Sequence, residues 1–233
     1  MSSSSSSAGA RAAAGVAIGG VLIALGGVLH PRVDTSLEFE QGLAGMFESS
    51  MWAASHVLTM AGFGVLALSL AVLAGAWTPG LRLIGRIAAA ATAFAAVESL
   101  PHLLAASDAA AISRGDATPL ADLHTMLQAV STPAVGLSIA VLAVAGARSG
   151  VLDGGRVGTA FAVMGGLAFA LAGPAIAITE SSEPSPLFAG SAGIAVWAVV
   201  AGVRTSRRLS RDATAGLAAD RGRQLAPASG QAR

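Results

Sequence analysis

Residues 52–76 read WAASHVLTMAGFGVLALSLAVLAGA, a stretch without a single Asp, Glu, Lys or Arg. A transmembrane α-helix needs about 20 predominantly apolar residues to cross roughly 30 Å of hydrocarbon. This stretch is long enough, and five comparable stretches occur at about 12–30, 82–105, 119–147, 157–180 and 187–204. The sequence therefore predicts an all-α fold, a polytopic integral membrane protein with six transmembrane helices in a bundle.

The composition supports the same fold class. The 233-residue chain is 54% hydrophobic and only 12% charged, with a mean hydropathy of +0.69. Soluble domains carry about 25% charged residues, so a water-soluble fold would leave too much apolar surface exposed. The chain contains no cysteine, which excludes disulfides, thiolate metal sites, iron–sulfur clusters and covalently attached c-type haem. Nothing in the sequence indicates a phosphate-binding loop or a nucleic-acid partner.

The distribution of arginine predicts which side of the membrane each connection faces. Cytoplasmic connections are enriched in Lys and Arg, and twelve of the fourteen arginines fall on one side of the predicted membrane. Arg32 and Arg114 fall on the other, outer side, together with ten of the thirteen acidic residues. The sequence therefore predicts a cell-membrane protein with both termini in the cytoplasm. The cytoplasmic set is Arg11, Arg82, Arg86, Arg148, Arg156, Arg204, Arg207, Arg208, Arg211, Arg221, Arg223 and Arg233.

The two ends of the chain read as disordered cytoplasmic tails, because neither offers a face to bury. Six consecutive serines dominate residues 1–11, and residues 205–233 are rich in Arg, Ala and Gly. An arginine cluster follows the sixth helix, where each side chain would attract anionic lipid head groups by about 1 kcal/mol. The alternative is a stop-transfer signal alone. The predicted partners are therefore the bilayer and its anionic head groups; the cluster is Arg204, Arg207, Arg208 and Arg211.

Local signals mark two helix starts on the outer side. Thr118 and Pro119 are typical of an N-cap and a first helical turn. In the first outer connection, the spacing of Thr35 and Glu38 matches a capping box. It precedes a short amphipathic stripe, which predicts a short helix that lies on the outer interface or over the mouth of the bundle. The alternative is a loop that only packs on the bundle. The stripe is Phe39, Leu43, Met46 and Phe47.

All four histidines fall at the outer ends of predicted helices. His30 and His56 flank the first outer connection, and His102 and His124 flank the second, so two successive hairpins present the same pair. Glu98 lies deeper, roughly 12 Å from the outer end of the third helix at 1.5 Å per residue. A carboxyl group at that depth costs about 2–3 kcal/mol and normally faces the bundle interior with a partner.

The partner of Glu98 must be a histidine, a metal ion, a proton or water, because no arginine lies at comparable depth. His102 is four residues on and shares its helix face, while His124, Gln128 and Ser131 form a similar stripe on the fourth helix. Imidazole with carboxylate suits zinc, copper or iron. We therefore predict a metal site with candidate ligands His56, Glu98, His102 and His124, and with His30 and Glu180 less favoured.

Several functions fit this pattern. The favoured one is a non-enzymatic outward-facing His/Glu pocket that binds a transition metal ion or haem, since facing helices of bundles hold both. A proton-linked small-solute carrier would use Glu98 and His102 as a relay. An intramembrane metal-dependent lipid hydrolase would use Glu98 as general base, but a His-x-x-x-His pair is missing. A purely structural bundle is the remaining alternative. Trp52, Trp77 and Trp197 are expected to be bundle or interface residues.

Overall fold

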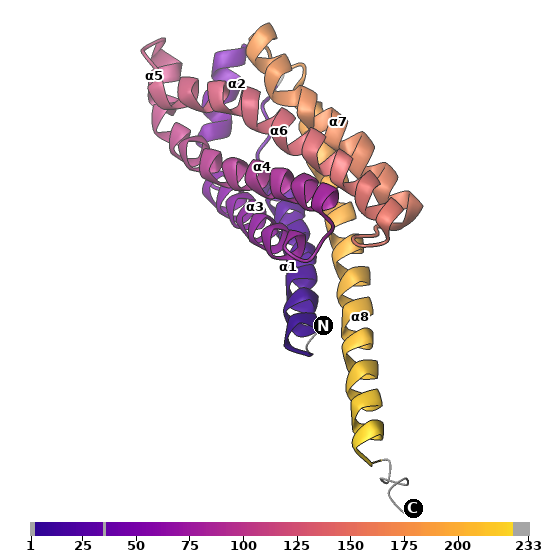
Figure 1. Ribbon diagram of the computed structural model, residues 1–233. Coiled ribbons are helices and arrows are strands. Elements are labelled where there is room, and N and C mark those ends of the chain that lie inside the picture. The colour runs from indigo at the N-terminus through magenta and orange to yellow at the C-terminus, as the bar shows by residue number, and fades with distance from the viewer. Residues whose placement is uncertain (1–2, 35, 226–233) are drawn as a thin grey trace, which may run out of the picture.

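The computed structural model describes residues 3–34 and 36–225, and within this part every regular element is helical (Figure 1). Six of the helices are long and apolar enough to cross a membrane. The predicted all-α bundle with six membrane-spanning helices is therefore confirmed. The long helices are α1 (Ser3–Leu29), α3 (Trp52–Ala74), α4 (Pro79–Leu104), α6 (Pro119–Ser149), α7 (Gly155–Thr179) and α8 (Gly190–Leu225); the short elements are α2 (Phe39–Phe47), η1 (Ala105–Asp108), α5 (Ala109–Arg114) and η2 (Ser185–Ala189).

The long helices form a closed ring in which sequence neighbours pack together and α1 closes the circle against α8. Small residues allow this close packing, as expected where lipid gives no hydrophobic drive for association. At Gly136 of α6, an added Cβ would lie 2.2 Å from the carbonyl oxygen of Gly166 in α7. Fully buried apolar side chains fill the interior of the ring; they include Leu66, Leu70, Val135, Ile139 and Leu142.

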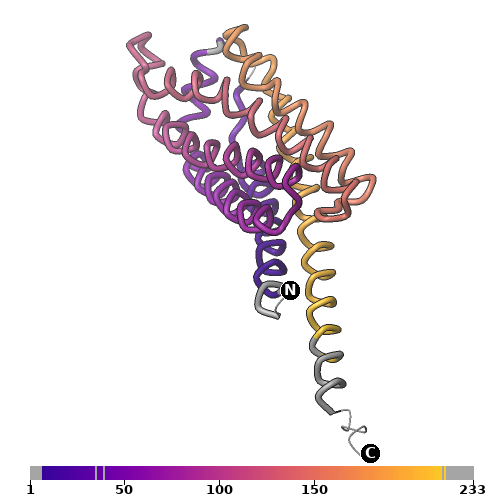
Figure 2. The backbone as a smooth tube through the Cα atoms, in the orientation of Figure 1, coloured from indigo at the N-terminus to yellow at the C-terminus, as the bar shows by residue number. Residues whose placement is uncertain are grey.

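Both ends of the described chain lie at the same end of the bundle, and α8 continues well past its neighbours there (Figures 1 and 2). The short helices α2 and α5 lie at the opposite end, which we call the distal end. They pack against each other through an apolar cluster that includes Phe47, Ala109 and Ile112. The α2–α5 layer thus covers the distal end of the ring.

Helix α2 has the predicted amphipathic character. Leu43 and Met46 are half-buried and Phe47 is buried, whereas Glu40 and Glu48 are exposed. Thr35, the first residue of the predicted capping box, lies outside the described residues, and the side chain of Glu38 at the N-cap makes no capping hydrogen bond. The helix is therefore stabilised by its packing on α5 and not by the Glu38 side chain.

Helix α6 begins at Pro119 as predicted, but its cap comes from elsewhere in the sequence. The Thr118 side chain makes no capping bond and donates instead to the Asp122 carboxylate at 3.1 Å. The buried Asp108 carboxylate accepts hydrogen bonds from the backbone N–H groups of Leu120 and Ala121 at 2.8 and 3.0 Å. Asp108 therefore does the capping, from twelve residues before the first of these amides.

The terminal helices extend into the segments expected to be disordered tails, 1–11 and 205–233, of which residues 1–2 and 226–233 lie outside the described part of the chain. Helix α1 begins at Ser3, and α8 continues through the arginine cluster to Leu225. Ala, Arg, Leu and Gln are strong helix formers, and they dominate the segment after Arg204. Contacts with the bundle add to this propensity, because Arg204 pairs with Asp153 at 3.1 Å and Arg208 donates to the carbonyls of Gly150 and Val151.

Candidate metal centre

The distal end of the ring brings the first two histidines together through a glycine contact. Gly26 lies one turn before His30, and an added Cβ there would lie 2.8 Å from the carbonyl oxygen of Ser55. This absence of a side chain lets the end of α1 approach the first turns of α3, where His56 follows Ser55. The His30 and His56 ring centroids are 4.8 Å apart as a result.

The other two histidines join this pair from α4 and α6. The His102 ring lies 4.2 Å from that of His56 and 6.1 Å from that of His30, measured between centroids. The His124 ring stacks on His102 at 3.5 Å, with the two planes inclined by 23°. Four imidazoles from four adjacent segments of the ring therefore form one continuous group, which we call the histidine cluster.

Glu98 faces the interior of the bundle and is bound to this cluster. Its side chain is 7% exposed, and Oε1 accepts a hydrogen bond from Nδ1 of His124 at 2.7 Å. Ser131 lies on the other side, with its hydroxyl 3.5 Å from Oε2. The partner of Glu98 is thus a histidine on the neighbouring helix, one of the alternatives expected from the sequence.

The hydrogen bonds of the rings determine which nitrogens remain free to bind a ligand. Nδ1 of His56 donates to the Trp52 carbonyl at 2.6 Å, and Nδ1 of His30 donates to the Pro31 carbonyl at 2.6 Å. With Nδ1 of His124 committed to Glu98, these three rings each have an Nε2 that carries a lone pair and no proton. Metal-binding histidines are commonly held in this way, by a carbonyl or carboxylate on the second ring nitrogen.

Nε2 of His56 is the most informative atom of the cluster. It is buried and has no hydrogen-bond partner among the described residues. Most buried polar side-chain atoms in proteins are satisfied, and an exception requires an explanation such as a bound ion. The other exceptions in the described chain are Thr159 Oγ1, Trp197 Nε1 and Arg82 Nε.

Trp52 lies against the cluster, whereas the sequence predicts only a bundle or interface residue at this position. Its ring is 3.9 Å from His56, 5.2 Å from His102 and 4.6 Å from Phe47, measured between centroids. Its indole N–H donates to the Leu103 carbonyl at 3.1 Å. Trp52 therefore separates the imidazoles from the α2–α5 layer. The i, i+4 spacing from His56 was a usable signal, because it places both side chains on one face of α3.

Two groups of side chains are arranged so that they could hold a metal ion. One consists of His30, His56 and His102, and the other of Glu98, His102 and His124; within each group the ligand atoms lie within 4.8 Å of one another. All four favoured candidates and the less favoured His30 therefore come together. Glu180 belongs to neither group, and it is exposed in a left-handed conformation (φ 48°) at the end of α7.

The spacing of the rings suits an ion better than a haem. A haem held between two imidazoles needs a flat slot for the macrocycle. Here the rings of His102 and His124 are stacked at 3.5 Å, and His56 approaches His102 to 4.2 Å. Nitrogen donors with one carboxylate are typical ligands of zinc, copper and other first-row transition ions.

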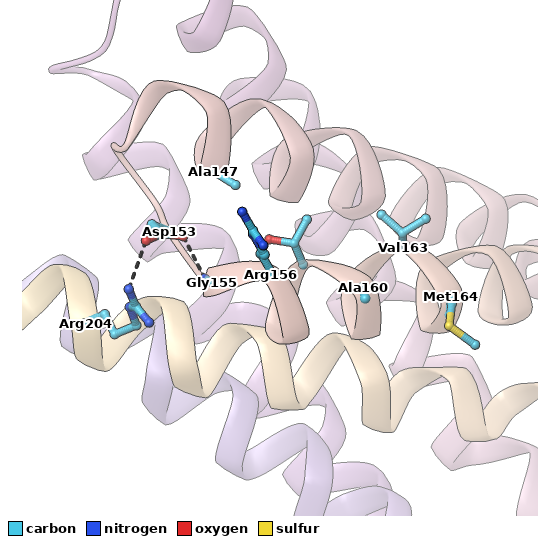
Figure 3. Close-up of a pocket in the computed structure, with 9 residues that line it drawn as sticks. Ala147, Asp153, Gly155, Arg156, Ala160, Val163, Met164 and Arg204 are labelled. Atoms are coloured by element: carbon cyan, nitrogen blue, oxygen red, sulfur yellow. Dashed lines mark hydrogen bonds and ion pairs between the residues drawn. The ribbon is translucent and has the colours of Figure 1, made fainter.

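A groove of about 860 Å³ lies at the other end of the bundle, along α7 between α6 and α8 (Figure 3). Asp153, Arg156 and Arg204 line one part of it and Val163 and Met164 another. None of its lining residues is a histidine, so it is separate from the histidine cluster.

Fold and site together define a helical multi-pass membrane protein with a buried His/Glu cluster at one end. The chain matches no protein-family model, no curated protein and no solved structure.

Proposed function

We propose that this protein binds a first-row transition metal ion, such as Zn²⁺ or Cu²⁺, through the histidine cluster and Glu98. The single observation that carries the proposal is the buried, unpartnered Nε2 of His56, whose Nδ1 is committed to the Trp52 carbonyl. This nitrogen is poised as an acceptor where other imidazoles converge, and a bound cation would satisfy it.

Metal content tests the proposal directly. The full-length protein, purified in detergent and exposed to Zn²⁺ before desalting, should retain zinc in stoichiometric amount by elemental analysis. His102→Ala should lower the retained zinc at least tenfold because it removes the ligand common to both groups, and His56→Ala, which removes a ligand of one group, should lower it by at least half. Glu180→Gln, which alters an exposed acid outside the cluster, is the matched control and should retain the wild-type amount. A wild-type protein that retains no zinc, copper, nickel, cobalt or manganese would refute the proposal.

The apolar interior of the bundle favours a metal-binding protein over a solute carrier. Between the histidine cluster and the end of the bundle opposite the distal end, the side chains of Leu66, Leu70 and Ile139 are fully buried. The buried hydroxyls of Thr92 and Ser138 donate to carbonyls of their own helices. A proton-linked carrier would need a polar route there, and these side chains provide none. The carrier predicts pH-dependent solute uptake into vesicles that Glu98→Gln abolishes.

The hydrogen bond between Glu98 and His124 also makes a lipid hydrolase a poorer explanation of the site. A general base must reach the proton that it removes, whereas Oε1 of Glu98 already accepts from His124. We therefore favour a binding protein over an enzyme.

We also propose that the chain resides in the cell membrane with both termini in the cytoplasm, so that the histidine cluster faces outward. The asymmetric distribution of arginine supports this orientation. A reporter that functions only in the cytoplasm should be active when it is fused after the last residue. Activity of a reporter that functions only outside the cell would reverse the assignment of every connection.

A further inference from the structure

The four histidines do not have equivalent hydrogen bonds. His30, His56 and His124 each use Nδ1 to donate to an oxygen, so each offers a single nitrogen to a metal. Among the described residues, His102 has no hydrogen-bond partner for either nitrogen. A ring with both nitrogens free is able to bind a different ion on each side.

His102 also occupies the position that such a bridge requires. It is the one residue common to the two metal-ligand groups, whose other members are His30 and His56 in one and Glu98 and His124 in the other. Each group supplies three protein ligands, the number that zinc sites with an exchangeable fourth position use. The cluster therefore contains two half-sites that meet at one imidazole.

Resting on the proposed function, we infer that the cluster is a dinuclear centre in which the His102 imidazolate bridges two transition metal ions. Binding of the second ion displaces the remaining ring N–H proton of His102 to water, and the freed lone pair forms the second metal–nitrogen bond. The negative charges of this imidazolate and of Glu98 offset part of the repulsion between the cations. In the second half-site the ion takes the place of the proton between Nδ1 of His124 and Oε1 of Glu98, which lie 2.7 Å apart, and that proton moves to Nε2 of the same ring.

Copper loading provides the test, because two Cu²⁺ ions joined by an imidazolate are magnetically coupled. The full-length wild-type protein should retain two Cu²⁺ per chain after desalting. The integrated intensity of its electron paramagnetic resonance signal should correspond to far fewer Cu²⁺ ions than elemental analysis finds. His30→Ala should retain one ion with a full-intensity, uncoupled signal, because it damages only one half-site. His102→Ala should lose the coupling completely, and Glu180→Gln should keep both the copper content and the coupling.

The outcomes separate this inference from the proposed function. One Cu²⁺ per chain, or two with a full-intensity signal, would overturn the bridge and leave single-ion binding intact. No retained copper or other ion would overturn both. If the variants do not fold, the copper content and spectrum of the wild-type protein still decide.

Discussion

His56 shows how one side chain can indicate a ligand. The residue is 3% exposed, Nδ1 donates to the Trp52 carbonyl, and Nε2 has no partner among the described residues. A buried polar atom left unpaired costs about 1–3 kcal/mol. A metal ion would remove that cost and add stability that grows with the logarithm of its affinity. The same ring thus links the packing of α3 to the proposed chemistry.

Trp52 provides an optical test at this scale. Its ring lies 3.9 Å from that of His56, whereas Trp77 follows the far end of α3, about 35 Å along the axis at 1.5 Å per residue. With Trp77→Phe and Trp197→Phe combined, Trp52 is the remaining tryptophan. Adding Cu²⁺ should then quench most of the fluorescence, because the bound ion lies within contact range of the indole.

The matched control is the protein that keeps Trp77 and Trp197 but carries Trp52→Phe. Its emission should change little on addition of Cu²⁺. Equal quenching of the two proteins would show that copper binds nonspecifically and not at the histidine cluster.

Single residues also show what the sequence could reveal about the site. The depth of Glu98 in an apolar helix predicted an interior acid, and the acid does face the interior. The i, i+4 rule indicated His102 as its neighbour, yet its hydrogen bond goes to His124 on another helix. Spacing along one helix predicts a shared face, but it does not predict which neighbouring helix that face meets.

At the scale of elements, the contact between α1 and α3 positions half of the histidine cluster. An added Cβ at Gly26 would lie 2.2 Å from Thr59 Oγ1 and 2.8 Å from the Ser55 carbonyl oxygen. Gly26→Ala should therefore push the helices apart, lower the free energy of unfolding by about 1–3 kcal/mol and weaken metal binding. Thermal unfolding in detergent and zinc retention measure the two effects.

Gly27 offers a neighbouring control. An added Cβ there would meet only Ser191 Oγ at 3.8 Å, an ordinary contact. Gly27→Ala should leave both stability and zinc retention close to wild type. Similar behaviour of the two variants would mean that close approach at Gly26 is not what positions His30.

The cap of α6 gives a second prediction for an element. The Asp108 carboxylate accepts from two amides at the start of α6, close to a helix N-terminus where negative charge is favourable. Asp108→Ala should cost about 1–2 kcal/mol, and Asp108→Asn should cost less. Asp116→Ala, which alters an exposed carboxylate paired with Arg114, should have little effect on the unfolding temperature. An Asp108→Ala variant as stable as the wild type would contradict this role.

The long helices are predictable from the sequence because the length of each apolar stretch alone specifies them. The residues at which these helices begin and end are less predictable. The cap from Asp108 depends on how the η1–α5 segment folds back, which no local signal encodes. The continuation of α8 to Leu225 reflects helix propensity combined with the contacts of Arg204 and Arg208. Composition alone had suggested disorder for that segment.

At the scale of the whole molecule, the closed ring explains why five candidate ligands meet. Helices α1, α3, α4 and α6 are consecutive around the ring, so His30, His56, His102 and His124 follow one another at the distal end. The sequence placed all four at one end but could not supply the order of helices. Without that order, the sequence does not predict that His30 lies in the cluster or that Glu180 lies outside both metal-ligand groups.

The arginine cluster yields a prediction about the bilayer. Arg204 and Arg208 are bonded to the α6–α7 connection, whereas Arg207 and Arg211 are exposed and make no hydrogen bond or ion pair with described residues. Replacing Arg207 and Arg211 by Gln should weaken association with phosphatidylglycerol by about 1 kcal/mol per charge. Native mass spectrometry of the protein in mixed micelles measures the bound lipid.

The comparison variant changes Arg32 and Arg114, which lie outside the cluster, to Gln. Retention of acidic lipid should then match the wild type. If both double variants lose lipid equally, total charge and not the arginine cluster governs the association.

The most direct test of the central claim is X-ray absorption spectroscopy of the zinc-loaded protein. If the imidazoles hold the ion, the first shell should consist of nitrogen and oxygen at about 2.0–2.1 Å, with the outer-shell scattering typical of several imidazole rings. That scattering should be lost in His102→Ala. A first shell of oxygen alone, or a spectrum that His102→Ala leaves unchanged, would contradict the proposed metal centre.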